Sequence, residues 1–302
     1  MTKYTADTTS PNLLKFSLDM DSGVVVLEFD EIVAKDSLDP TAITLQYAEY
    51  AGSSTNLYSI LNATNNADNI NDLVVKFTLG NTDMNNIKGL TGLAISSDTT
   101  FLRSTSDLIT DTAGNSMTRV ADGAALGVTN YTFDTTRPKC SAYVLQENGY
   151  LIMQFSETID YLTMNASALK ISDGASSSNF YQLTEESAVF YGSYDTTLTL
   201  QLNGDFSGLQ TLNLGVSQLT SYLSFAKGFL SDTAGNKIEG VPDSDPMLMG
   251  PSLNSYDLDM DEGTMKLYFS ETVMGTSTSA KPENLTFDAT ALNFVYGEEN
   301  YT

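Results

Sequence analysis

The sequence predicts an all-β protein built from antiparallel β-sandwich domains in tandem. Apolar and polar residues alternate along many short segments, as they do in strands that bury one face. Turn signals separate these segments about every 8–12 residues, and this spacing is typical of a β-sandwich. Long stretches of the chain also repeat one another, which is the signature of tandem domains.

The clearest alternation lies at 14–18, 73–77, 198–202 and 212–216. Ser22-Gly23 and Asn148-Gly149 predict tight hairpin turns between the first two strands of two copies, because such pairs accept a positive φ. The helical signal is weak, and we expect at most one turn within 86–93 and one within 217–229. Each copy should therefore fold as one sandwich of seven or eight strands.

Three markers define the repeat. Phe, then Ser or Asp, Glu, any residue, and Val or Ile ends the second strand at 29–33, 155–159 and 269–273. The sequence Asp-Thr-Ala-Gly-Asn occurs at 111–115 and again at 232–236. The sequence Tyr-Thr-x-Asp-Thr-Thr-x-Pro occurs at 4–11 and 131–138. Three markers in the same order make a chance origin untenable.

The markers predict the closing strand of a preceding repeat at 1–6, a first repeat at 7–136, a second at 137–250 and a partial third at 251–302. Either the sequence is a window on a longer array, or a strand from another molecule completes the third copy. We favour the window. The joint before Pro138 is short and stiffened by proline, which favours an elongated array.

These markers resemble the Ig-like repeats of bacterial surface-layer proteins and large extracellular adhesins. In that family Asp-Thr-Thr-x-Pro opens a domain, Phe-Ser-Glu follows the second strand and Asp-x-Ala-Gly-Asn precedes the last. The corresponding positions are 134–138, 155–157 with 269–271, and 111–115 with 232–236. The resemblance implies Ig-like sandwiches in stalks, surface layers, adhesins or accessory modules of secreted enzymes. The chain departs from the pattern at Asp30 and at the second joint, which reads differently over 243–251.

Composition excludes several classes of function. The chain has 38 acidic residues against 14 basic ones, and its net charge of −24 argues against binding nucleic acid. Without histidine and with one cysteine, it has no Ser-His-Asp triad, no histidine-ligated zinc and no intrachain disulfide. No apolar run is long enough to insert in a membrane, and we expect no enzyme. Cys140 is either a buried thiol or an interchain disulfide.

Acidic residues recur at the ends of the copies, in loops that a sandwich can bring together. Because Ca²⁺ takes six to eight oxygen ligands, they are candidate calcium ligands at the domain joints: Glu31, Asp111, Asp134, Glu157, Asp232 and Glu271, with Asp7 in the first joint. Alternatively, the Asp and Asn of Asp-Thr-Ala-Gly-Asn only build a turn in which Gly supplies the positive φ. The sequence favours the turn over calcium.

Possible N-glycosylation sequons lie at Asn62, Asn130, Asn165, Asn284 and Asn300. Their number is what chance gives in a chain so rich in Asn, Ser and Thr, so they permit a glycan without indicating one. Exposed tyrosines such as Tyr47, Tyr50 and Tyr58 offer a possible platform for stacking sugars, although most aromatic residues belong in cores.

We therefore expect an extracellular or cell-surface structural protein, a segment of a stalk, filament or coat. It would assemble with neighbouring repeats or with other copies of itself. The alternatives are an adhesin or carbohydrate-binding module, and an accessory region of a large secreted enzyme. A pocket present in one copy and absent from the others would favour binding.

Overall fold

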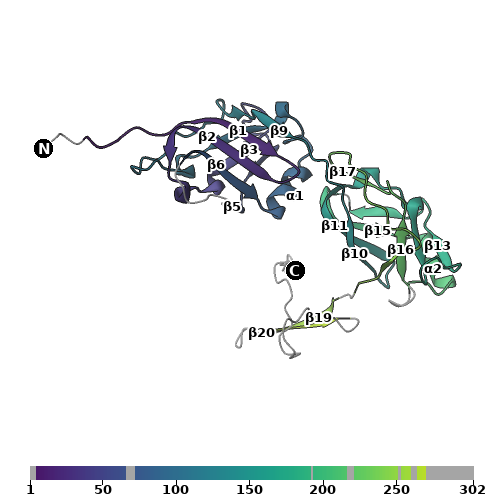
Figure 1. The fold of residues 1–302 in the computed structure, drawn as a ribbon. Coiled ribbons are helices and arrows are strands. Elements are labelled where there is room, and N and C mark those ends of the chain that lie inside the picture. Colours follow the sequence, from purple (N-terminus) through teal and green to yellow (C-terminus); the bar gives the residue numbers. More distant parts are fainter. Residues whose placement is uncertain are drawn as a thin grey trace, which may run out of the picture. The chain divides into compact units, whose positions relative to one another are not determined.

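The computed structural model describes residues 5–65, 72–191, 193–215, 221–250, 253–259 and 264–269. Residues 1–249 belong to one compact unit and residues 250–302 to a second. Most of the regular structure is β-strand in several sheets, and nearly all strand pairs are antiparallel, as the sequence predicts (Figure 1).

The first half of the compact unit contains two sheets. The larger has the order β5-β6-β2-β1-β9 and the smaller has the order β4-β3-β7-β8. Their strands are β1 Leu13–Asp19, β2 Val24–Val33, β3 Ile43–Gln46, β4 Leu57–Ser59, β5 Ala63–Asn65, β6 Asp72–Leu79, β7 Phe101–Ser104, β8 Leu126–Gly127 and β9 Asn130–Thr132. Strand β9 pairs with β1 in parallel, which closes the larger sheet.

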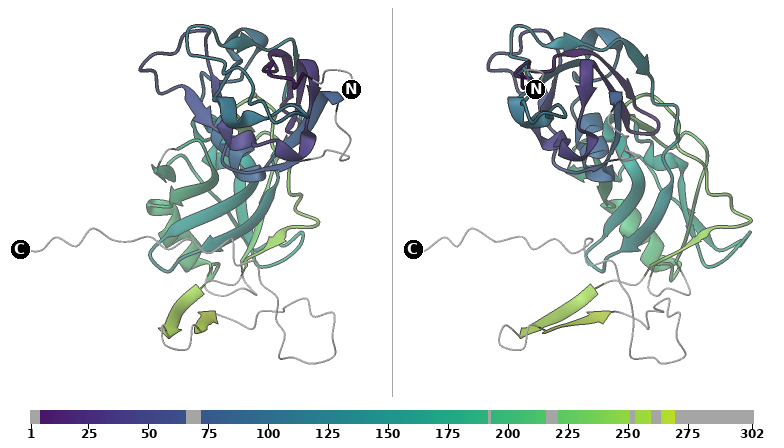
Figure 2. Two further views of the ribbon diagram at one scale, coloured as in Figure 1. Left: turned by 90° about the vertical axis from the view of Figure 1, so that its left-hand side faces the viewer. Right: turned by 60° about the vertical axis from the view of Figure 1, so that its left-hand side comes forward.

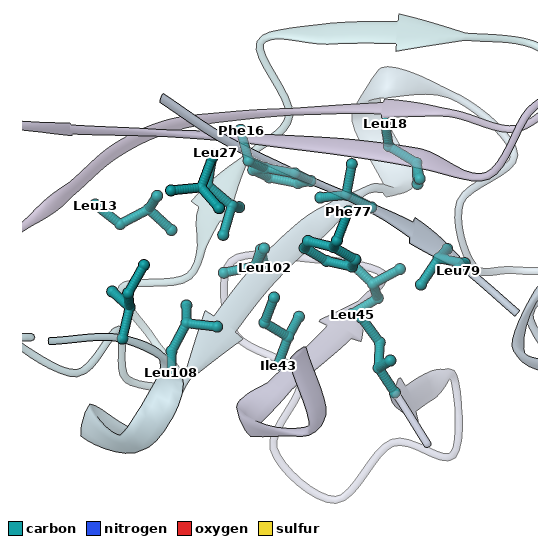
Figure 3. Packing of buried hydrophobic residues seen from close by; sticks show 14 of the residues in the cluster. Leu13, Phe16, Leu18, Leu27, Ile43, Leu45, Phe77, Leu79, Leu102 and Leu108 are labelled. Carbon is teal, nitrogen blue, oxygen red and sulfur yellow. The ribbon is translucent and has the colours of Figure 1, made fainter. Parts of the chain in front are cut away.

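The side chains that alternate inward from these two sheets form one core. Phe16, Leu27 and Phe77 of the larger sheet face Ile43 and Leu102 of the smaller sheet (Figure 3). All five are at most 1% exposed, which is what a period-two pattern gives when only one face of a strand is buried.

The second half repeats this plan. One sheet has the order β10-β11-β15-β14, with β17 also paired to β11, and the other has the order β13-β12-β16-β18. The strands are β10 Cys140–Leu145, β11 Tyr150–Asp160, β12 Leu169–Ser172, β13 Phe180–Gln182, β14 Ala188–Tyr191, β15 Asp195–Gln201, β16 Tyr222–Phe225, β17 Ser231–Asp232 and β18 Met247–Leu248. Strands β10 and β11 run side by side as long teal arrows in both views of Figure 2. A separate core fills this half, with Leu151, Met153 and Leu223 fully buried.

Each half has more strands than the seven or eight that the sequence predicts. The excess consists of strands of two or three residues, such as β8 and β18, which are too short to show an alternating pattern.

Two helices follow equivalent strands, α1 Asn81–Gly89 after β6 and α2 Gly204–Thr211 after β15. The turn predicted within 86–93 overlaps α1. Strand β16 occupies 222–225 of the segment 217–229 in which a turn is predicted, and residues 217–220 lie outside the described residues, so that turn stays a prediction. Helix α2 escaped prediction because its two glycines weaken the helical signal, and the buried Asp205 and Leu209 hold it in place instead. The short 3₁₀ turns are Lys35–Ser37, Pro40–Ala42, Ser97–Thr99, Ser106–Leu108, Tyr161–Thr163 and Ala166–Ala168.

The second unit contains an antiparallel hairpin of β19 Leu253–Asp259 and β20 Thr264–Phe269, where the sequence predicts the first two strands of the third copy. Glu271, Asn284 and Asn300 lie outside the described residues. Thr5 and Ala6 are in no strand, and the predicted domain boundaries remain predictions.

Candidate functional site at the joint between the two sandwiches

The recurring acids come together in two groups. Carboxylate oxygens of Asp7, Glu31 and Asp111 lie within 4.8 Å of one another. Those of Asp134, Glu157 and Asp232 do the same in the second half. Both groups form where the end of a long strand, the loop before the closing segment and the joint peptide meet. The repeat markers therefore predicted which residues share a loop cluster.

The Asp-Thr-Ala-Gly-Asn segment builds the same turn in both halves. Asp232 Oδ1 accepts the backbone N–H groups of Ala234 at 2.9 Å and Asn236 at 2.8 Å, and its Oδ2 accepts Asn236 Nδ2–H at 2.9 Å. Gly235 has a φ of 89°, which glycine adopts without strain. Asn236 Nδ2 also donates to the backbone oxygen of Asp134 at 3.1 Å, so the turn holds the joint peptide. Asp111 has the same partners in the first half.

A lysine of the first half enters the second group of acids. Lys88, in the last turn of α1, places its Nζ 2.7 Å from Asp134 Oδ2 and 2.6 Å from Glu157 Oε2. The three side chains are only 8%, 5% and 7% exposed. Sequence reasoning missed this residue, because nothing in the repeat pattern singles out one lysine in a weak helical segment.

Two further contacts join the halves beside this ion pair. Thr158 of β11 donates its backbone N–H to Asn85 Oδ1 at 3.1 Å and its hydroxyl to Asn85 O at 2.8 Å. Asp21, in the hairpin between β1 and β2, accepts the backbone N–H groups of Thr135 at 2.6 Å and Thr136 at 2.9 Å. Burial acts to raise the pKa of Asp21, but these hydrogen bonds prevail and lower it to about 2. The charged carboxylate of Asp21 thus holds the joint peptide to the first half through strong hydrogen bonds to its backbone N–H groups.

The electrostatics of the Lys88 cluster are unbalanced. Burial raises the pKa of Glu157, and the charges of Asp134 and Asp232 raise it further, while Lys88 lowers it. Burial acts to lower the pKa of Lys88, yet its two carboxylate partners leave that pKa above its usual value. Both pKa values are thus raised, which favours the charged form of Lys88, held by two carboxylates, and the neutral form of Glu157, which also faces the charges of Asp134 and Asp232. Glu157 Oε1 is buried and has no hydrogen-bond partner among the described residues.

The first group of acids has the same composition but is more open to solvent, although Asp111 is buried like its counterpart Asp232. Asp7 is exposed and Glu31 half-buried, and the next residue, Ile32, is 52% exposed. Its counterpart in the second half, Thr158, is 1% exposed because α1 contacts it. Burial raises the pKa of Glu31, as do the charges of Asp7 and Asp111.

The oxygen atoms of the Lys88 cluster do not match the ligand set of a calcium ion. Both oxygens of Asp232 accept hydrogen bonds from its own turn, and Lys88 takes one oxygen each of Asp134 and Glu157. Glu157 Oε1 and Asp134 Oδ2 are buried without a hydrogen-bond partner, and Asp134 Oδ2 already lies against the Lys88 ammonium, whereas Ca²⁺ needs six to eight oxygens. Calcium at the joints stays a prediction, while the ammonium of Lys88 already supplies positive charge here.

The other predicted sites lie apart from this cluster. Asn62, Asn130 and Asn165 are exposed. Burial raises the pKa of the Cys140 thiol to about 12, so it is protonated and unreactive at neutral pH. Tyr50 is 69% exposed, whereas Tyr58 is half-buried. Within the described residues, no helix has the length and apolar character needed to cross a membrane.

Sequence reasoning also missed two buried aspartates that anchor the helices. Asp83 accepts the Tyr58 hydroxyl at 2.6 Å and the backbone N–H groups of Leu61 and Asn62. Asp205 has the same place in α2 and accepts the Tyr181 hydroxyl at 3.1 Å. The signal was an Asn-x-Asp triplet directly after an alternating segment, at 81–83 and again at 203–205.

No protein-family model matches the chain, and no curated protein matches its sequence. The solved structures that are similar to it include two of surface-layer proteins. The S-layer protein rSbsC(31-844) is 12% identical with a TM-score of 0.25, and the match covers 85% of this chain and 22% of that one. The N-terminal part of the bacterial S-layer protein SbsC is 13% identical with a TM-score of 0.24, covering 87% and 42%. The chain thus spans less than half of either relative, and a likeness this weak carries no argument about function.

Proposed function

We propose that the chain is a structural segment of an extracellular or cell-surface array, whose work is to hold sandwich domains together at fixed joints. The observation that carries this proposal is the ion pair of Lys88 with Asp134 and Glu157, which joins the two halves through side chains that are at least nine-tenths buried.

A fixed joint needs contacts that resist both bending and twisting. Lys88 and Asn85 bond to the second half from one helix, and Asp21 bonds to the joint peptide from a separate hairpin. Anchors on different elements restrain more directions of motion than one flexible peptide can. These contacts support a joint of defined geometry.

The repeat supports a second part of the proposal, assembly with neighbouring domains of the same kind. The open group of Asp7, Glu31 and Asp111 has the composition of the group that Lys88 enters. An equivalent basic side chain from a neighbouring sandwich would find the same partners there. Ile32 and Thr158 occupy equivalent positions in the two halves, but Ile32 is exposed whereas Thr158 is buried. The surface around Ile32 is thus the one that a neighbouring domain would cover.

Lysine replaces calcium in this proposal. A tethered ammonium offsets the repulsion among three acids without requiring a metal in the medium, although it leaves more negative than positive charge in the cluster.

Immunogold labelling tests the function in the cells that produce the chain. An antibody raised against the full chain should label the outside of intact cells along fibres or a surface coat. Label confined to the interior of permeabilised cells would contradict an extracellular structural role.

A further inference from the structure

A groove lies over the smaller sheet of the first half, along β3, β7 and the segment 119–122. Its volume is 620 Å³, and its polar lining residues are Thr44, Arg103, Thr105, Ser106, Arg119 and Asp122, with Ser104 beneath them. Thr44 and Arg103 are direct cross-strand partners. They point away from the core, because their neighbours Leu45 and Leu102 point into it.

The groove concentrates positive charge in a strongly acidic chain. Arg103, Arg119 and Arg137 are the only arginines in the sequence, and two of them line this groove. No hydrogen bond or ion pair within the described residues engages either guanidinium group.

The one carboxylate in the groove is already engaged. Asp122 accepts hydrogen bonds from the backbone N–H groups of Ala51 at 2.8 Å and Gly52 at 3.0 Å, and from Gln46 Nε2 at 3.0 Å. The Ala51 bond is the main reason that the pKa of Asp122 lies below its usual value, and the nearby charge of Arg103 adds a smaller effect. Asp122 is therefore held as an anion by other donors and leaves the guanidinium groups available.

The same place in the second half has a different charge pattern. There the groove is smaller, at 270 Å³, and it contains Lys170 at the position of Thr44 and Ser224 at that of Arg103. Lys170 Nζ lies 2.6 Å from Asp243 Oδ2 and 4.2 Å from the centre of the Phe180 ring. Lys170, the one basic residue among the described residues that line this second groove, is thus already paired with Asp243. Both halves have a groove at this place, but only the groove of the first half has basic side chains available for a ligand.

We propose that the groove of the first half binds the carboxylate of an acidic saccharide. Guanidinium groups match carboxylates with paired, charge-assisted hydrogen bonds, and the hydroxyls of Thr44, Thr105 and Ser106 suit the hydroxyls of a sugar. The volume lies within the range of about 300–1,000 Å³ that small-molecule sites occupy.

A saccharide suits the groove better than a peptide. An extended peptide binds by adding a strand to a free sheet edge, but β3 lies between β4 and β7, and β7 lies between β3 and β8. Its apolar lining is limited to Ala42, Val120 and Ala121, which offer little surface to a large apolar side chain of a peptide. It contains no aromatic ring either, so recognition would rest on charge and hydroxyl groups rather than on stacking.

Titration of the ¹⁵N-labelled full chain with trigalacturonic acid tests the proposal by NMR at 0.15 M salt. At about this ionic strength the Debye length is roughly 8 Å, so the distant acids are screened while groups in contact are not. Saturable shifts of amides around Thr44 and Arg103 are expected. Arg103→Gln and Arg119→Gln should each raise the dissociation constant about fivefold or more. A loss of this size is what removing one partly exposed, charged hydrogen bond gives.

Arg137→Gln is the matched control, because Arg137 is exposed and lies outside the groove. It should bind as the unchanged chain does. No saturable shifts, or an equal loss in all three variants with native-like spectra, would overturn the site. Maltotriose should not bind, because it lacks the carboxylate. Equal binding of triglutamate would overturn the saccharide as ligand, because only the carboxylate would then be recognised.

Discussion

Replacing Lys88 by methionine removes the charge at the joint and keeps the length of the side chain. Asp134 and Glu157 would then be buried without a cation, in side chains that are 5% and 7% exposed. Removing one partner of a buried ion pair costs about 3–5 kcal/mol. Here the carboxylates can regain water if the joint opens, so we expect the lower end, about 3 kcal/mol.

The loss should appear in the coupling between the halves and not in either core. Each half has its own buried cluster, and Lys88 belongs to neither. Differential scanning calorimetry should therefore show the transition of residues 5–249 lowered by several degrees and separated into two steps. The separation follows because the halves would no longer unfold together.

Lys15→Met is the matched control. Lys15 Nζ lies 3.2 Å from Glu28 Oε1, but the side chains are 54% and 43% exposed, so this pair should contribute about 0–1 kcal/mol. Equal melting curves for Lys88→Met and Lys15→Met would refute the reasoning. Adding Glu157→Gln to Lys88→Met should restore part of the stability, because it removes one of the unpaired charges.

Three further predictions concern other parts of the account. Asp83→Ala should lower the free energy of unfolding in urea by about 2–4 kcal/mol, because it leaves buried N–H and O–H donors without an acceptor, whereas Asp98→Ala at an exposed position should change little. The stabilisation from Asp21, whose pKa is about 2 when folded and 3.8 otherwise, should be fully present above pH 3.8 and fall as pH drops towards 2; urea unfolding of Asp21→Asn should lack that part of the pH dependence. A chelator should not change the melting of the second half, because Lys88 already supplies a cation to its acids; a transition lowered by chelator and restored by Ca²⁺ would support the candidate calcium site of the sequence instead.

The repeat made the acid clusters predictable. Glu31 and Asp111 occupy the same positions in their copy as Glu157 and Asp232 do in theirs, so equivalent loops had to meet in both. The Asp-Thr-Ala-Gly-Asn turn was equally readable, since Gly114 and Gly235 both have a positive φ.

Features that differ between the two copies could not be predicted from the repeat. Lys88 has Gln210 at its position in α2, so alignment of the copies hides its role. The arginine groove depends on Arg103 and Arg119, which lie 16 positions apart and meet only because the segment after the 111–115 turn returns alongside β7. Helix α2 depends on tertiary anchoring through Asp205, which local propensity does not report.

Residual dipolar couplings of the ²H,¹⁵N-labelled chain provide the most direct test of a fixed joint. Couplings from residues 13–132 and from residues 140–249 should fit one common alignment tensor in the unchanged chain. They should require two different tensors in Lys88→Met. Two tensors already in the unchanged chain, or one shared tensor that survives the substitution, would contradict a joint fixed by Lys88.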